Sequence, residues 1–320
     1  LTSAENQHLL QFMPFDALLR SDIKADLLLV DEAAAIPTPV LQQILHRFSR
    51  IVFASTEHGY EGTGRGFQLR FQQYLNEYNP DWRKLHIQQP VRYQADDPLE
   101  QTIFNCFLLQ QSASGSEYDR QKPTQLQCFT YTDWIDQPAL LQQVFSLLSL
   151  AHYQTDVMDL WALLDNPTLK LYTLEQDQRV LACALISFEG ELDAELASAV
   201  AHGKRRVQGH LLAQSLAFHC LQPQLAEQKM ARIQRIVVHP LVQSQGIGSQ
   251  LLSFVLQDLL GQQYLIGTSF GATLALAKFW QKAGFIPVKL SHQNEQASNE
   301  ASVLMLYGEQ FRALQQQFSR

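Results

Sequence analysis

The chain has 320 residues, of which 46% are hydrophobic and 17% are charged. This length suits about two domains of ordinary size, and the composition is that of a folded chain rather than a disordered one. A net charge of -7 excludes a generally basic protein that coats nucleic acid. No apolar run reaches the ~18 residues of a membrane helix, so we expect no membrane partner and a cytoplasmic location.

Neither the start of the chain nor its cysteines indicate secretion. The opening LTSAENQHLLQFM lacks the basic start and apolar core of a signal peptide. The four cysteines, Cys106, Cys128, Cys183 and Cys220, form no C-x-x-C pair. We interpret them as reduced, buried, cytosolic thiols. Because residue 1 is Leu, we expect either a fragment of a longer protein or a processed chain.

Short apolar runs alternate with amphipathic helices in the first third of the chain, residues 1–110. Such alternation of strands and helices predicts an α/β domain with a parallel sheet that is covered on both faces. We expect strands at 26–30, 50–56 and 83–90, and helices at 37–49 and 69–78.

The first strand, in LLLVDEAAAIP, runs directly into the two carboxylates of Asp31 and Glu32. A buried strand that ends in Asp-Glu is typical of a P-loop nucleotidase, where the carboxylates hold Mg²⁺ and the attacking water. The partner pattern G-x-x-x-x-G-K-[ST], whose amides and Lys hold the phosphates, occurs nowhere in the 320 residues. The sequence therefore carries only the acidic half of an ATP site.

A polar stretch, residues 111–126, separates this part from the rest and is predicted to be a linker or exposed loop. A second domain is expected at 127–306, followed by a C-terminal extension at 307–320. Within it we expect a β-hairpin that turns at 176–178. The remaining helices are expected at 138–153, 209–221, 249–260 and 273–285, and the remaining strands at 235–240, 264–270, 286–291 and 302–308.

The loop LVQSQGIGS, residues 241–249, is the most informative element. It follows a strand of β-branched residues that Pro240 ends, and it presents Gly246 and Gly248 immediately before an amphipathic helix. Glycines let the backbone curl so that several N–H groups converge at the positive end of the helix, which makes a pyrophosphate site without a lysine. A tight strand-to-helix turn with no ligand is the alternative.

The loop and a later helix together resemble the Gcn5-related N-acetyltransferases (GNAT proteins). The shared features are the order strand, Q-x-x-G-x-G-x and helix, and the segment KFWQKAGF. The resemblance implies a strand that opens away from its neighbour and pairs with the pantetheine arm of acetyl-CoA. It assigns the pantetheine to Ile236, Val237 and Val238, the pyrophosphate to Gln243, Ser244, Gln245, Gly246, Ile247, Gly248 and Ser249, and a further cofactor contact to Lys282.

The acid–base groups for acetyl transfer are less evident. Many enzymes of this kind use a tyrosine on the KFWQKAGF helix, and this helix has none. The candidates are His239, just past the opened strand, and His292 with Glu295 before the last strand. A surface histidine without a catalytic role is the alternative for each. For Lys282 the alternative is a solvated lysine that the helix dipole favours.

Across nearly the whole chain, the order of motifs resembles the bacterial tRNA(Met) cytidine acetyltransferase family, which is related to eukaryotic RNA cytidine acetyltransferases. The motifs are LLLVDEAAAIPTPVL, STEHGYEGTGRGFQLRF, QQPVRY, AHYQTDVMDL and RIVVHP-x(5)-GIG. The resemblance implies a RecA-like helicase module, partial in this chain, followed by a GNAT acetyltransferase domain. It also implies N4-acetylation of the wobble cytidine of elongator tRNA(Met), with acetyl-CoA and ATP or GTP.

Residue roles in nucleotide binding follow from the same resemblance. Asp31 would hold Mg²⁺ and Glu32 the attacking water, while Thr56 and Glu57 would sense the γ-phosphate and Arg92 would contact ATP. A surface arginine in an ion pair is the alternative for Arg92. The resemblance further implies that the full protein extends beyond both ends of the chain.

A basic stretch, HGKRRVQGH at 202–210, leaves a local RNA contact open through Lys204, Arg205 and Arg206. A solvated loop is the alternative for this stretch. Two other functions also stay open: an acetyl-CoA-binding regulatory module without transfer, and a protein or small-amine N-acetyltransferase with a vestigial ATPase domain. The oligomeric state does not follow from the sequence.

Overall fold

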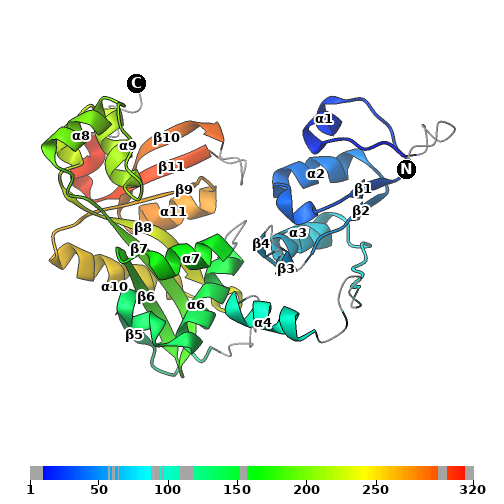
Figure 1. Ribbon diagram of the computed structural model, residues 1–320, viewed down its shortest axis with the longest axis horizontal. Helices are drawn as coiled ribbons and strands as arrows, with labels where there is room; N and C mark the ends of the chain where they lie inside the picture. The colour runs from blue at the N-terminus through cyan, green and yellow to red at the C-terminus, as the bar shows by residue number, and fades with distance from the viewer. Residues whose placement is uncertain are drawn as a thin grey trace.

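The computed structural model describes residues 10–56, 58–59, 62–63, 65–87, 89, 94, 97–108, 118–151, 157–294 and 301–313, some of them by their backbone alone. In Figure 1 a small α/β part contains the N-terminal elements, and a larger part is built around a seven-stranded sheet.

The N-terminal part is a short parallel sheet packed against helices. Strands β1 (Leu28–Val30) and β2 (Ile51–Phe53) pair in parallel, which confirms the first two expected strands. The core behind them consists of buried apolar side chains such as Leu41, Ile44 and Phe71. The other elements are α1 (Phe15–Arg20), η1 (Ala33–Ala35), α2 (Thr38–Arg47), β3 (His58–Gly59), β4 (Gly62–Thr63), α3 (Arg65–Tyr78) and α4 (Pro98–Cys106).

The strand predicted at 83–90 is wrong for its described part. Residues 83–87 have no regular structure. Leu85 and Ile87 are 89% and 88% exposed. Alternating apolar residues favour a strand only where a neighbouring strand pairs with them and buries one face, and among the described residues none pairs with this segment.

The larger part is one mixed sheet with the strand order β10-β11-β9-β8-β7-β6-β5 (Figure 1). Every neighbouring pair is antiparallel except β8 and β9, which are parallel. The strands are β5 (Gln125–Thr130), β6 (Leu169–Gln176), β7 (Arg179–Gly190), β8 (Lys229–Val238), β9 (Leu265–Gly271), β10 (Phe285–Asn294) and β11 (Ala301–Tyr307). The predicted hairpin and the predicted strands of this part are confirmed.

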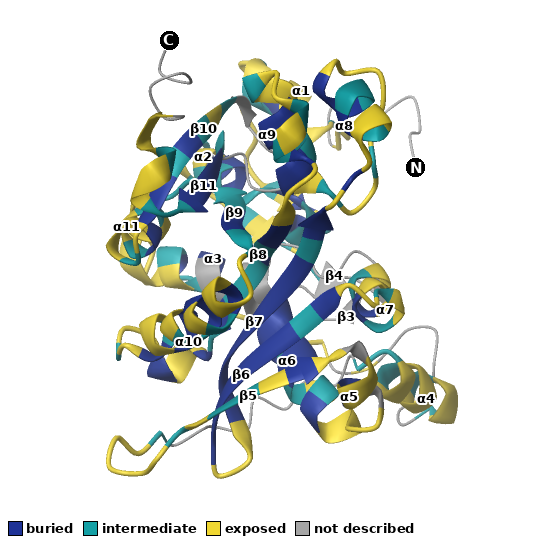
Figure 2. Cartoon of the chain, turned by 90° about the vertical axis from the view of Figure 1, so that its left-hand side faces the viewer, coloured by how far each residue is buried: buried dark blue, intermediate teal, exposed yellow. Residues whose placement is uncertain are grey.

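Helices cover both faces of the sheet, so its strands are largely buried (Figure 2). Helices α10 (Ile247–Gly261) and α11 (Leu274–Lys282) pack with one face in a single core. The other face is divided between two cores, one with α6 and α7 and one with α8 and α9. The helices on that face are α5 (Tyr131–Ile135), α6 (Pro138–Ala151), α7 (Val157–Asp165), α8 (Ala194–Ala201) and α9 (Leu211–Cys220).

The expected helices are confirmed, but α1, α4, α5 and α7 were not predicted, and neither was α8. It begins after Asp193, whose carboxylate accepts a hydrogen bond from the Leu196 N–H at 2.8 Å. The interpretation of the cysteines is wrong in part, because Cys183 is buried whereas Cys106 and Cys128 are exposed. Within the described ranges, the helices are all too short or too polar to cross a bilayer.

Candidate functional site

Strands β8 and β9 part from each other in the middle of the sheet. Their pairing ends at Ile233 and Thr268, although β8 continues to Val238. On its other side β8 stays paired with β7, where the register shifts so that Gln234 has no partner. Such a β-bulge bends a strand and increases its twist. The bulge therefore coincides with the point at which β8 leaves β9, and the expected opened strand is confirmed.

The direction of the backbone groups on the opened part of β8 follows from one hydrogen bond. The His239 N–H donates to the Leu181 carbonyl of β7 at 2.8 Å. Because groups alternate along an antiparallel strand, the backbone of Val237 also faces β7, whereas that of Ile236 and Val238 faces the opened side. The side-chain amide of Gln243 donates to the Val238 carbonyl at 3.1 Å. The remaining groups can pair with an extended amide chain or polarise a carbonyl.

The loop after β8 places a helix N-terminus beside this opened edge. A 3₁₀ turn, η3 (Pro240–Val242), leads to Ser244 and Gly246, which both have left-handed backbones with φ of 60° and 88°. The first bond of α10 runs from the Gln250 N–H to the Gly246 carbonyl at 3.0 Å. The N–H groups of residues 247–249 therefore have no acceptor within the helix and suit an anion.

Close packing fixes this turn against β8 and α11. A Cβ atom on Gly248 would lie 3.1 Å from Cγ2 of Val238, so even the smallest side chain there would press on Val238. On α11, Trp280 is buried and its ring stacks on Phe270 with 6.0 Å between centroids. Lys282 is exposed in the last turn of α11. This position is compatible both with a cofactor contact and with a solvated lysine.

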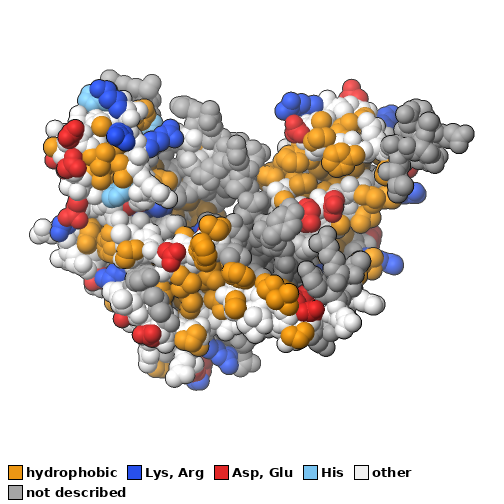
Figure 3. Space-filling view, in the orientation of Figure 1, with side chains coloured by type: hydrophobic (Ala, Val, Ile, Leu, Met, Phe, Trp, Pro, Cys, Tyr) orange, Lys and Arg blue, Asp and Glu red, His pale blue; other side chains and the backbone are white. Residues whose placement is uncertain are grey.

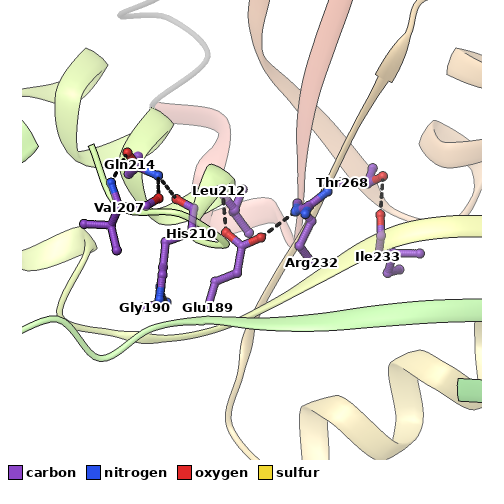
Figure 4. A network of polar contacts seen from close by, with 9 residues as sticks. All are labelled: Glu189, Gly190, Val207, His210, Leu212, Gln214, Arg232, Ile233 and Thr268. Atoms are coloured by element: carbon purple, nitrogen blue, oxygen red, sulfur yellow. Dashed lines mark hydrogen bonds and ion pairs between the residues drawn. The ribbon is translucent and has the colours of Figure 1, made fainter. Parts of the chain in front are cut away.

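Three polar contacts brace β8 around its bulge. The Thr268 hydroxyl donates to the Ile233 carbonyl at 3.0 Å. Arg235, just past the bulge, pairs with Asp159 of α7 at 2.5 Å. Arg232 pairs at 2.5 Å with Glu189, whose side chain is fully buried (Figure 4). Sequence reasoning missed these residues, because the partners are far apart in the chain and belong to no motif.

The same network holds the basic loop 202–210 onto the sheet (Figure 4). The side chain of Gln214 on α9 bonds both the N–H and the carbonyl of Val207. At the end of the loop, Nδ1 of His210 accepts the Gly190 N–H at 3.0 Å. Figure 3 shows basic side chains on the surface of the larger part, at the end where α8 lies. Lys204, Arg205 and Arg206 are all exposed, so they are open to a polyanion.

The three acid–base candidates are placed differently by the structure. His239 is 9% exposed, and burial lowers the pKa of its imidazole. Its Nδ1 accepts the Leu241 N–H at 3.4 Å, so the neutral ring carries its proton on Nε2. The backbone of His292 belongs to β10, and Glu295 lies outside the described residues. Of the three, His239 alone has a described side-chain environment.

Three of the five predicted nucleotide residues, Asp31, Glu32 and Thr56, lie at one edge of the small parallel sheet. Asp31 and Glu32 follow β1 and Thr56 follows β2, and the carboxyl ends of parallel strands share an edge. Asp31 is exposed, and its Oδ1 accepts the Glu32 N–H at 3.0 Å. Its second oxygen fits the acidic half of a magnesium-nucleotide site, but the described residues hold no cluster of three or more potential metal ligands. Glu57 and Arg92 lie outside the described residues.

Two protein families match the chain, one in each of its two parts. Residues 143–263 and 260–309 match the family described as GNAT acetyltransferase 2. Residues 1–110 match the family described as RNA cytidine acetyltransferase NAT10/TcmA, helicase domain.

Similar curated proteins carry one name, tRNA(Met) cytidine acetyltransferase TmcA. The protein from Vibrio cholerae is 44% identical over 97% of this chain and 44% of its own length. The protein from Nitrosococcus halophilus is 42% identical over 93% of this chain and 40% of its own length. The chain thus spans less than half the length of these relatives. The chain belongs to the GNAT acetyltransferase 2 family, and its first 110 residues match the helicase domain described for RNA cytidine acetyltransferase NAT10/TcmA.

Proposed function

We propose that this chain is the acetyl-transferring core of an RNA cytidine N4-acetyltransferase that modifies tRNA(Met). The observation that carries the proposal is the opened edge of β8 at Ile236 and Val238, which leads directly into the Gly246 turn and α10. Acetyl-CoA needs both features, an edge for its amides and a helix N-terminus for its diphosphate. The acceptor of the acetyl group, a cytidine of tRNA(Met), is proposed from the names of the relatives.

The opened edge suits the chemistry of acetyl transfer. A backbone N–H of Ile236 or Val238 donates to the thioester carbonyl and stabilises the negative charge that develops on its oxygen. The exocyclic nitrogen of the cytosine attacks the carbonyl carbon, so that a C–N bond forms while the C–S bond breaks. The nitrogen gives up one proton, and the departing thiolate takes one.

The candidate proton acceptors are His239, His292 and Glu295. A cytosine amine is scarcely basic and loses its proton mainly as the C–N bond forms, so a weak base or a chain of waters suffices. Burial lowers the pKa of His239, which favours its neutral form. Its Nδ1 already accepts the Leu241 N–H, so proton transfer to this ring requires that hydrogen bond to break.

We assign nucleotide binding to the other half of the chain, within the longer protein. Asp31 and Glu32 supply carboxylates to a magnesium-bound ATP or GTP, and Thr56, Glu57 and Arg92 complete the contacts to phosphate. The RNA residue that accepts the acetyl group is the wobble cytidine of elongator tRNA(Met). The protein acts in the cytoplasm.

The exposed basic loop is the RNA-binding element of this proposal. Lys204, Arg205 and Arg206 contact phosphates, and α9 holds their loop in place through Gln214. Neutralising the three side chains should weaken tRNA binding. It should also reduce the slope of log K against log salt concentration by the amount expected for about three lost phosphate contacts. An unchanged salt dependence would argue against this role.

The decisive experiment uses the full-length protein that contains this chain. It is incubated with tRNA(Met), acetyl-CoA and ATP, and the digested nucleosides are analysed for N4-acetylcytidine. We expect the modified nucleoside with the unaltered protein and its loss with Gly248→Val, which fills the cofactor turn. Absence of N4-acetylcytidine, or preferential acetylation of a protein or a small amine, would refute the proposal.

A further inference from the structure

The second half of the predicted linker is fixed to the transferase sheet. The side-chain amide of Gln176, at the end of β6, accepts the Asp119 N–H at 2.9 Å and donates to the carbonyls of Asp119 and Lys122 at 2.9 and 3.1 Å. Gln176 is only 4% exposed. Lys122 also pairs with Asp177 of the following turn at 2.7 Å. Residues 118–124 therefore form a defined surface of this domain.

This segment contacts the glycine turn before α10. Arg120 donates from Nε to Oε1 of Gln245 at 3.2 Å, across 125 positions of the chain. Gln250, in the first turn of α10, donates to the Thr124 hydroxyl at 3.1 Å. Because Gln245 immediately precedes Gly246, the first contact ties a guanidinium to the turn from which α10 starts.

The turn itself lacks a positive side chain. Residues 243–249 read QSQGIGS and include no Lys or Arg. A helix N-terminus offers only about half a positive charge, whereas a diphosphate diester carries about two negative charges. Among the nitrogens of Arg120, Nε alone bonds an acceptor within the described part of the chain. The terminal nitrogens can therefore bind phosphate oxygens in the two-pronged geometry that guanidinium favours.

We propose that Arg120 binds the diphosphate of acetyl-CoA, with Gln245 as the residue that positions it. The segment that joins the helicase part to the acetyltransferase part then forms one wall of the cofactor site. The inference rests on the proposed acetyl-CoA binding. It adds a consequence, because a residue that contacts cofactor from the joining segment couples cofactor binding to the position of that segment.

The test is calorimetric titration of acetyl-CoA into this chain and its variants. Arg120→Gln should raise Kd roughly tenfold, the effect of one lost charge-assisted contact. Arg120→Lys should recover part of the loss, because the charge remains but the planar fork does not. Lys122→Gln is the matched control, since it removes a cation from the same segment whose partner is Asp177. Because that pair is exposed and the three hydrogen bonds of buried Gln176 still hold the segment, Kd should stay unchanged.

Two analogues locate the contact on the cofactor. Acetyl-pantetheine lacks the diphosphate and should bind Arg120→Gln and the unaltered chain equally, which also shows that the variant is folded. Acetyl-dephospho-CoA keeps the diphosphate but lacks the 3′-phosphate, and it should show the full tenfold loss.

Three results would overturn the inference: an unchanged Kd in Arg120→Gln, an equal loss with acetyl-pantetheine, or a loss that disappears with acetyl-dephospho-CoA. Failure of the unaltered chain to bind acetyl-CoA is a distinct result. It would overturn the proposed function, and the inference with it.

Discussion

The hydroxyl group of Thr268 donates a hydrogen bond to the backbone carbonyl of Ile233, with 3.0 Å between the two oxygens. The two residues are also the last pair at which β8 and β9 are joined. Thr268 is 2% exposed, so the bond lies in the interior of the sheet. It ties the strands together immediately before the bulge that separates them.

Replacement of Thr268 by valine should loosen this junction. The change keeps the shape of the side chain but leaves the Ile233 carbonyl without its donor, at a cost of about 1–2 kcal/mol in the free energy of unfolding. We also expect weaker acetyl-CoA binding, because the opened edge begins at this point. Urea unfolding and calorimetry measure the two effects. Thr268→Ser, which keeps the hydroxyl, should retain affinity, and equal behaviour of both variants would contradict the role of the bond.

The two glycines of the turn should respond differently to substitution. A Cβ on Gly248 would meet Val238 at 3.1 Å, whereas one on Gly246 would meet nothing within 4 Å. Gly248→Val should therefore displace the turn and weaken acetyl-CoA binding by roughly tenfold or more. Gly246→Asn should be milder, since asparagine tolerates a left-handed backbone. If Gly246→Asn were the more damaging change, our account of the turn would be wrong.

The ion pair between Arg235 and Asp159 should couple β8 to α7. The two side chains are 14% and 26% exposed, so solvent screens the pair only in part. We expect Arg235→Met or Asp159→Asn alone to lower the free energy of unfolding by about 1–2 kcal/mol. A double-mutant cycle on urea unfolding should give a favourable coupling energy. Strict additivity of the two changes would exclude a contribution from the pair.

Stability should fall as the pH is lowered through the range in which histidine titrates. Burial holds the pKa of His239 below its ordinary value of 6.5. As pH falls below 6.5, the unfolded chain binds a proton before the native chain does, so the free energy of unfolding decreases until the folded pKa is passed. His219, whose pKa burial also lowers, adds to this slope.

The variant His239→Asn isolates one histidine's share of that slope. Between pH 7.5 and 5.5, its urea midpoint should change less than that of the unaltered chain. Parallel pH profiles for the two proteins would mean that His239 titrates alike in the native and unfolded states.

The cysteines should differ in reactivity toward a thiol reagent. Burial raises the pKa of Cys183 to about 12, so its thiol is both inaccessible and protonated. Cys106 and Cys128 are exposed and should react in the native chain, Cys128 more slowly because partial burial raises the pKa of its thiol. Mass mapping after brief labelling should find Cys183 unmodified until denaturant is added. Early labelling of Cys183 would contradict the packing of β7.

Local patterns were enough to predict much of the fold. The hairpin of β6 and β7, the strand β8 and the helices α10 and α11 follow from alternation and helical periodicity, which act over a few residues. The glycine turn could be located for the same reason, because Gly246 and Gly248 lie between a strand and a helix within one short stretch. The strand expected at 83–90 failed because a strand also needs a partner, which local pattern does not supply.

The sequence by itself therefore determined most of the elements and their order, the family resemblance and the place of the glycine turn. Tertiary structure alone decided where β8 leaves β9, because the bulge at Gln234 is a register difference between two strands. It also decided that Glu189 meets Arg232 and that Arg120 meets Gln245. These pairs are 43 and 125 residues apart in the chain. Only the folded sheet brings such groups within hydrogen-bonding distance, and no short-range pattern records which of them will meet.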